Sequence, residues 1–237
     1  MPTSPLLAHP LLRQLGQPAS PRVLATGFPR LDTSLHDGGW PLGALTELLV
    51  SQPGLVELRL LAPALKTLLQ KQGWVILIDP PGLPHAPAWG IAGLPLERLL
   101  IVKPESPKDW LWSVDQAARA GQPAVLAWPG RVSLDGKSLR RLQLAAEEGG
   151  GLLMVSRRSR EAETPSPAAL RLQVKPNAGH LDLNILKQRG HWGGQSISVP
   201  LPFPQVPPVS PAEWAAEAAL SVGAIPLRQP QLLRHRA

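Results

Sequence analysis

The chain has 237 residues, of which 43% are hydrophobic and 17% charged, so it can bury one sizeable core and does not fall into the disordered class. It contains no cysteine, which excludes disulfides, thiolate metal sites and cysteine nucleophiles. Most of the formal net charge of +7 lies in residues 151–237, which hold 10 Lys and Arg against 5 Asp and Glu; this asymmetry indicates an acidic or nucleic-acid partner, or serves only solubility.

The N-terminal segment, residues 1–22, is predicted to hold one short amphipathic helix ("HPLLRQLG") and a Pro/Ser linker. It lacks the basic start and long apolar run of a signal peptide, and no window of the chain approaches the length of a membrane span. We therefore expect a cytoplasmic protein without membrane contacts.

Apolar runs of strand length alternate with helical periodicity through the first two thirds of the chain. This alternation predicts an α/β fold with a mostly parallel sheet covered by helices on both faces. Strands are expected at residues 43–50, 74–79, 99–103, 123–128 and 151–156, and helices at residues 57–72, 108–120 and 138–148.

Beyond residue 160 the pattern becomes an alternation of polar and apolar side chains. Residues 168–175, 180–189 and 195–201 are separated by Pro-Asn or Gly-Gly turns, which predicts an antiparallel edge of the same sheet. Six prolines within Pro200–Pro211 then indicate an extended connector. The domain prediction is an N-terminal helix and linker (1–22), a core domain (23–202) and a Pro-rich connector with a tail (203–237).

Several sequence words in chain order resemble the RecA-like fold and, within it, the ImuA family, which is also described as SulA-like. The resemblance covers about Thr26 to Pro202. It is carried by "ATGFPRLDTSLHDGGWPLGALTELL", "LIDPPGLPHAPAW", "VLAWPG", "LRRLQLAAEEGG" and "LDLNILKQRGHWGGQSISVPLP".

This resemblance implies a RecA-like core in an accessory protein of translesion DNA synthesis during the SOS response. It implies a contact with ImuB, a catalytically inactive relative of the Y-family polymerases, and through ImuB with a DnaE-type error-prone polymerase and the sliding clamp. It also allows a direct contact with RecA. The alternatives are a SulA-like division inhibitor that binds FtsZ and, less favoured, an active RecA-type ATPase.

The segment after the first predicted strand has the position of a phosphate-binding loop without its chemistry. A P-loop reads G-x-x-x-x-G-K-[ST], whereas no lysine occurs here between Glu47 and Lys66. Aligned on the resemblance from Glu47, Gly54 stays in the loop, Val56 takes the place of the phosphate-binding lysine, and Glu57 that of the magnesium-binding threonine.

Two further catalytic positions of the family pattern are replaced. Pro81 stands where the resemblance expects the water-activating glutamate, and Trp128 where it expects the magnesium-orienting aspartate. We therefore expect a degenerate P-loop, no ATP hydrolysis, no cofactor and no metal, in a protein that is not an enzyme.

Two groups of residues are candidate partner or DNA contacts. The first is the "SRRSR" segment with Arg157, Arg158 and Arg160, which contacts phosphates or an acidic partner or is only a solvated loop, and we expect its DNA binding to be weak or absent. The second lies in the tail, where a short amphipathic helix at residues 210–220 docks on a partner or folds back on its own domain. Its candidate contacts are Trp214, Arg228, Arg234 and Arg236.

Overall fold

The structure, a computed structural model, describes residues 22–201 except residues 55, 72 and 122. The chain divides into two units, Met1–Pro202 and Phe203–Ala237. The predicted N-terminal helix and the predicted tail helix with Trp214 lie outside the described residues, as do the tail residues Arg228, Arg234 and Arg236.

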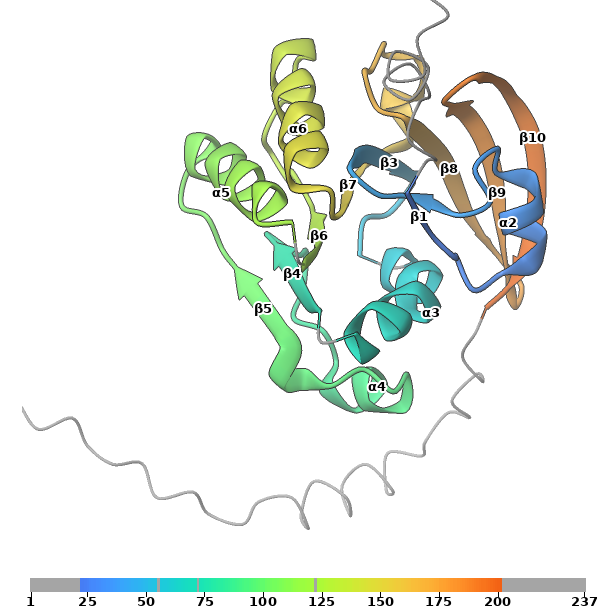
Figure 1. Cartoon of the computed structure of the whole chain (residues 1–237), viewed down its shortest axis with the longest axis horizontal. Coiled ribbons are helices and arrows are strands. Elements are labelled where there is room, and N and C mark those ends of the chain that lie inside the picture. Colours follow the sequence, from blue (N-terminus) through green and yellow to red (C-terminus); the bar gives the residue numbers. More distant parts are fainter. Residues whose placement is uncertain (1–21, 55, 72, 122, 202–237) are drawn as a thin grey trace, which may run out of the picture. The chain divides into compact units, whose positions relative to one another are not determined.

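Eight strands form one mixed sheet, which confirms the predicted α/β class (Figure 1). In chain order they are β3 (Ala44–Val50), β4 (Trp74–Ile78), β5 (Leu99–Val102), β6 (Pro123–Ala127), β7 (Leu152–Arg158), β8 (Leu170–Asn177), β9 (His180–Gln188) and β10 (His191–Pro200). Their order across the sheet is β10-β9-β8-β3-β7-β6-β4-β5. The six strands from β8 to β5 are parallel, and β9 and β10 extend the sheet as the predicted antiparallel edge.

All three predicted helices are present, as α3 (Glu57–Gln70), α5 (Pro107–Arg119) and α6 (Gly136–Gly149). Side-chain caps begin two of them: Ser106 Oγ accepts from the N–H of Asp109, and Asp135 accepts from the N–H of Ser138. Gly150, with φ of 71°, follows α6 in the left-handed conformation that ends helices.

Several short elements were not predicted. They are the two-stranded sheet of β1 (Val23–Leu24) and β2 (Trp40–Pro41), the helices α2 (Pro29–Ser34) and α4 (Ala86–Ile91), and the 3₁₀ turns η2 (Leu96–Arg98) and η3 (Ser159–Glu163). Helices and strands of two to six residues are too short for their hydrophobic side chains to show a periodicity in the sequence. Tertiary contacts hold them instead, as where α2 packs against β10 (Figure 1).

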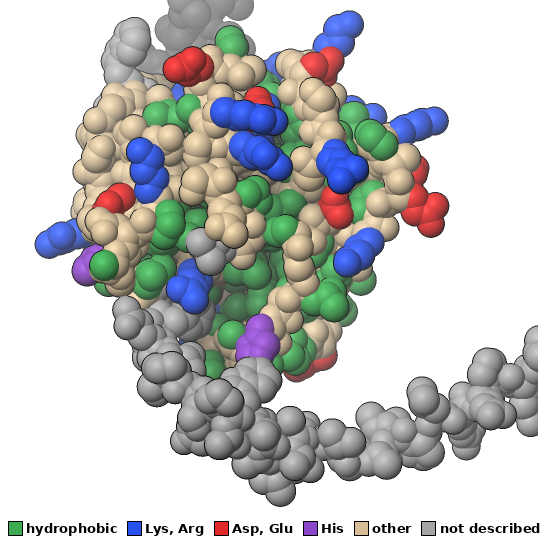
Figure 2. Space-filling view, turned by 180° about the vertical axis from the view of Figure 1, so that it is seen from behind, with side chains coloured by type: hydrophobic (Ala, Val, Ile, Leu, Met, Phe, Trp, Pro, Cys, Tyr) green, Lys and Arg blue, Asp and Glu red, His purple; other side chains and the backbone are tan. Residues whose placement is uncertain are grey.

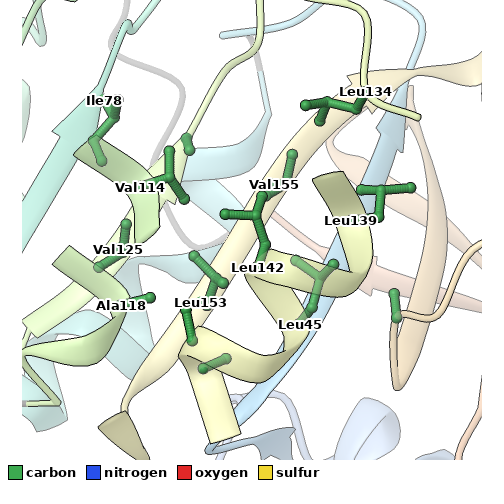
Figure 3. Packing of buried hydrophobic residues seen from close by; sticks show 14 of the residues in the cluster. Leu45, Ile78, Val114, Ala118, Val125, Leu134, Leu139, Leu142, Leu153 and Val155 are labelled. Atoms are coloured by element: carbon green, nitrogen blue, oxygen red, sulfur yellow. The ribbon is translucent and has the colours of Figure 1, made fainter. Parts of the chain in front are cut away.

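Helices cover both faces of the parallel part of the sheet. On one face α5 and α6 pack side by side over a cluster of buried side chains that includes Leu45, Val125 and Leu153 (Figure 3). Side chains alternate along a strand, so Leu48, three residues after Leu45, and Met154, one residue after Leu153, point to the opposite face, where α3 packs.

Asp115 joins α5 to α6. Its carboxylate is 3.2 Å from Nε of Arg119 and 3.0 Å from Nε of Arg141. Burial raises the pKa of Asp115, but the hydrogen bonds and charges of Arg141 and Arg119 outweigh burial and hold it below its ordinary value. A charged Asp115 thus fixes two guanidinium groups on the outer side of this helix pair.

Candidate functional site

The turn between β3 and α3, residues 51–56, lies at the carboxyl end of a central parallel strand. This is the edge of an open α/β sheet at which ligands bind. Gly54 adopts φ of 88°, and a Cβ placed on it would lie 2.4 Å from Cγ of Pro81, so the turn requires glycine there and packs directly on the loop after β4.

The side chain of Glu57, the first residue of α3, points inward and is 1% exposed. The N–H of Gly54 donates to its two carboxylate oxygens at 2.9 and 3.0 Å, and the N–H of Val56 donates at 3.1 Å. Nε1 of Trp128, directly after β6, donates at 2.9 Å, and the hydroxyl of Ser156 in β7 donates as well. Donors from three elements therefore converge on one carboxylate.

This arrangement closes the turn. In a phosphate-binding loop the backbone amides at the start of the helix hold a phosphate, whereas here the chain's own Glu57 carboxylate accepts from them. The space between Glu57, Trp128, Ser156 and the apolar residues around them has no room for a water-sized molecule. The backbone amides of the turn are thus already occupied by a carboxylate of the same chain.

The alignment places Glu57 where a magnesium-binding threonine is expected, at a ligand site. In the structure its carboxylate is buried among donors and faces no open cavity. Val56, aligned with the phosphate-binding lysine, is also buried and is the N-cap residue of α3. Nothing in the sequence indicates that Trp128 and Ser156 donate to Glu57, although both lie at the carboxyl ends of neighbouring strands.

Arg157, predicted as a surface contact, is buried, and this prediction is corrected. It is 5% exposed, and its guanidinium donates to Glu47 at 2.7 Å and to Glu161 at 3.1 Å. Glu47, at 0% exposure in β3, is also bound by Arg171 of β8 at 2.6 Å. Arg157 is therefore part of an internal ion-pair network. It lies inside because β7 continues two residues beyond its predicted end.

The network also holds the segment that follows β7. Arg171 donates to the backbone carbonyls of Glu161 and Ala162 in η3, at 2.8 and 3.1 Å. Burial and the charge of Arg171 lower the pKa of the nearby Lys187, and the opposite charge of Glu47 offsets part of this effect. In the sequence, Glu47 is only the start of the aligned loop, and nothing marks Arg171, because its place in an alternating strand gives no sign of a buried charge.

Of the three predicted arginines, Arg158 and Arg160 are on the surface. The side chain of Arg160 is 74% exposed and lies 3.5 Å from Glu161, and Arg158 is exposed at the end of β7. The structure thus leaves two arginines of this segment available for phosphate contacts.

The surface combines cations with exposed hydrophobic side chains. Figure 2 shows Lys and Arg side chains most frequent over the upper half of one face and hydrophobic ones across its centre and lower part. Among the described residues, the exposed large hydrophobic side chains are Trp74, Leu83, Ile91, Leu96, Leu100, Trp112 and Leu144.

Neither similarity to known proteins nor, within the described residues, a metal site or membrane span assigns a function to this chain. Neither a scan against protein-family models nor a search of curated proteins returns a match. Within residues 22–201, as far as they are described, no three His, Asp or Glu side chains are grouped to hold a metal ion. No helix of this part of the chain combines the length and the apolar character needed to cross a bilayer.

Proposed function

We propose that this protein is a non-catalytic, RecA-like accessory factor of SOS mutagenesis, similar to ImuA, which acts through contacts with an inactive Y-family polymerase relative of the ImuB type. The observation that carries the proposal is the Glu57 carboxylate on the amides of the turn after β3. A triphosphate at this turn would have to displace a carboxylate from its donors and would meet its negative charge, with no lysine between Glu47 and Lys66 to compensate.

The positions of the resembling words within the fold support the RecA-like part of the proposal. "GWPLGALTELL" spans β2 and β3, "VLAWPG" covers the end of β6 with Trp128, and "LRRLQLAAEEGG" lies in α6 and its C-terminal glycines. The word at the end of β6 thus supplies a donor to the closed turn, and the strand–turn–helix order around β3 matches that of phosphate-binding folds.

We expect no saturable binding of ATP below millimolar concentration. Titration of the purified chain with a fluorescent ATP analogue and Mg²⁺ should give a signal no different from that of buffer, beside an active P-loop ATPase as positive control. Micromolar, Mg²⁺-dependent binding would contradict the pseudo-ATPase part of the proposal and favour the ATPase alternative.

A partner surface for this function is available at the sheet edge formed by β5. No other strand among the described residues pairs with its outer side. Leu100 in β5 is 48% exposed, and Trp74 in the adjacent β4 is 44% exposed beneath the guanidinium of Arg98, which lies 5.6 Å from its ring centre. An unpaired edge with apolar side chains is suited to adding a strand from another protein.

The partner is identified by in vivo crosslinking. A tagged chain expressed in its native host after DNA damage should crosslink to a Y-family polymerase relative, and Leu100→Asp should reduce that recovery while Lys103→Asp, a charge change next to the same strand, should not. Recovery of FtsZ without the polymerase relative, together with filamentous growth of undamaged cells, would replace the proposal with the division-inhibitor alternative.

A further inference from the structure

The outer side of the α5 and α6 pair carries a concentrated positive charge that the proposed function does not use. A shallow groove along this side is lined by Arg119, Lys137, Arg140, Arg141 and Leu144. The surface lies on the face of the sheet opposite α3 and the closed turn, so it is independent of the Glu57 site.

Two of the four cations are held in place. Asp115, whose side chain is 4% exposed, binds Arg119 and Arg141 from below at 3.2 and 3.0 Å. Arg119 also pairs with Glu148, so two carboxylates offset two of the four cations. Lys137 and Arg140 make no ion pair with another described residue and leave the groove with a net positive charge. A positive site with pre-positioned guanidinium groups loses little side-chain entropy when it binds a carboxylate.

Exposed apolar side chains occur in the groove and on the adjacent helix. Leu144 lines the groove and is 45% exposed, and Trp112 on the outer side of the adjacent α5 is 58% exposed. An exposed tryptophan and leucine on neighbouring helices offer apolar contact area that phosphate groups alone would not use.

Acidic residues lie at both ends of this surface. Asp109 and Asp135 lie at the starts of α5 and α6, and Glu147 and Glu148 lie in the last turn of α6. The basic stretch from Lys137 to Leu144 therefore rises only about 10 Å along α6. A nucleic-acid strand extending past either end would meet like charge, whereas a short peptide fits between the ends.

We propose that the α5–α6 groove binds a short acidic segment of another protein, whose carboxylates pair with Arg119, Lys137, Arg140 and Arg141 and whose apolar side chains cover Leu144 and Trp112. Charge complementarity supplies attraction and orientation, and the two apolar residues supply the buried contact that holds the segment.

The test measures binding of a fluorescein-labelled peptide that carries leucines at i and i+4 with glutamates beside them on the same helical side. Lys137→Glu combined with Arg140→Glu should weaken binding to the full chain by about tenfold or more, because two attractions become repulsions. The matched control combines Arg158→Glu with Arg160→Glu, which makes the same charge change elsewhere and should change affinity by about twofold or less. Thermal unfolding of each variant checks that it is folded.

Two further measurements separate the contributions. Leu144→Ser should lower the affinity for the peptide several-fold without changing the salt dependence of binding. A peptide with serines in place of the leucines should bind Leu144→Ser and the unmodified chain with equal affinity. The proposal is overturned if the unmodified chain does not bind the peptide, or if both double variants reduce the affinity for the peptide equally. It is also overturned if oligothymidylate binds the unmodified chain more tightly than the peptide does and does not bind the Lys137→Glu, Arg140→Glu double variant. The groove would then be a nucleic-acid site. None of these outcomes bears on nucleotide binding at the turn after β3.

Discussion

Glu57→Gln is expected to lower the free energy of unfolding by about 3 kcal/mol although it changes the side chain by only one atom. The amide has one acceptor oxygen in place of two and turns an N–H group toward the donors that now bind the second oxygen. Because Glu57 is buried between α3, β6 and β7, water cannot replace the lost partner. Urea unfolding followed by circular dichroism measures the change.

The matched control is Glu163→Gln, the same change at an exposed position, which should shift the unfolding free energy by no more than about 0.5 kcal/mol. Glu57→Ala adds a specific test, since it removes the carboxylate and leaves the amides of Gly54 and Val56 without an acceptor. Added formate, the smallest carboxylate, should then raise the melting temperature of Glu57→Ala and leave that of the unmodified chain unchanged. Equal stability of Glu57→Gln and the unmodified chain would show that the closed turn contributes nothing to folding.

Glu47→Gln is expected to destabilise the fold by about 3–5 kcal/mol, since it leaves two buried guanidinium groups without their shared counter-charge. Arg157→Met should also be strongly destabilising, because it leaves Glu47 with only one of its two partners. Arg158→Met, the neighbouring exposed arginine, should change the unfolding free energy by no more than about 0.5 kcal/mol.

A double-mutant cycle on Glu47 and Arg157 isolates their interaction. We expect a coupling free energy of at least about 1 kcal/mol, because the two side chains are in direct contact at 2.7 Å within the core. DNA affinity supplies the opposing readout. If Arg157→Met leaves the free energy of unfolding unchanged but abolishes DNA binding, then Arg157 acts at the surface and not in the ion-pair network with Glu47.

The sheet and its main helices could be predicted from local pattern. Strands covered on both faces appear as continuous apolar runs, and α6 shows both its cap at Asp135 and its terminal glycines. The missing lysine between Glu47 and Lys66 could also be read directly, because the absence of a residue type needs no structure.

The sequence by itself therefore determined the α/β class, the order of the strands in the chain and the absence of a lysine between Glu47 and Lys66. Only the tertiary structure decided that Glu57 closes this turn and that Arg157 lies inside. Glu57 meets partners 71 and 99 residues away, and Glu47 meets its arginines 110 and 124 residues away. A charged residue in a local window looks the same whether it faces solvent or a distant counter-charge. Its burial is settled only when parallel strands bring their carboxyl ends to one edge of the sheet, where the partner can offset the cost of removing the charge from water.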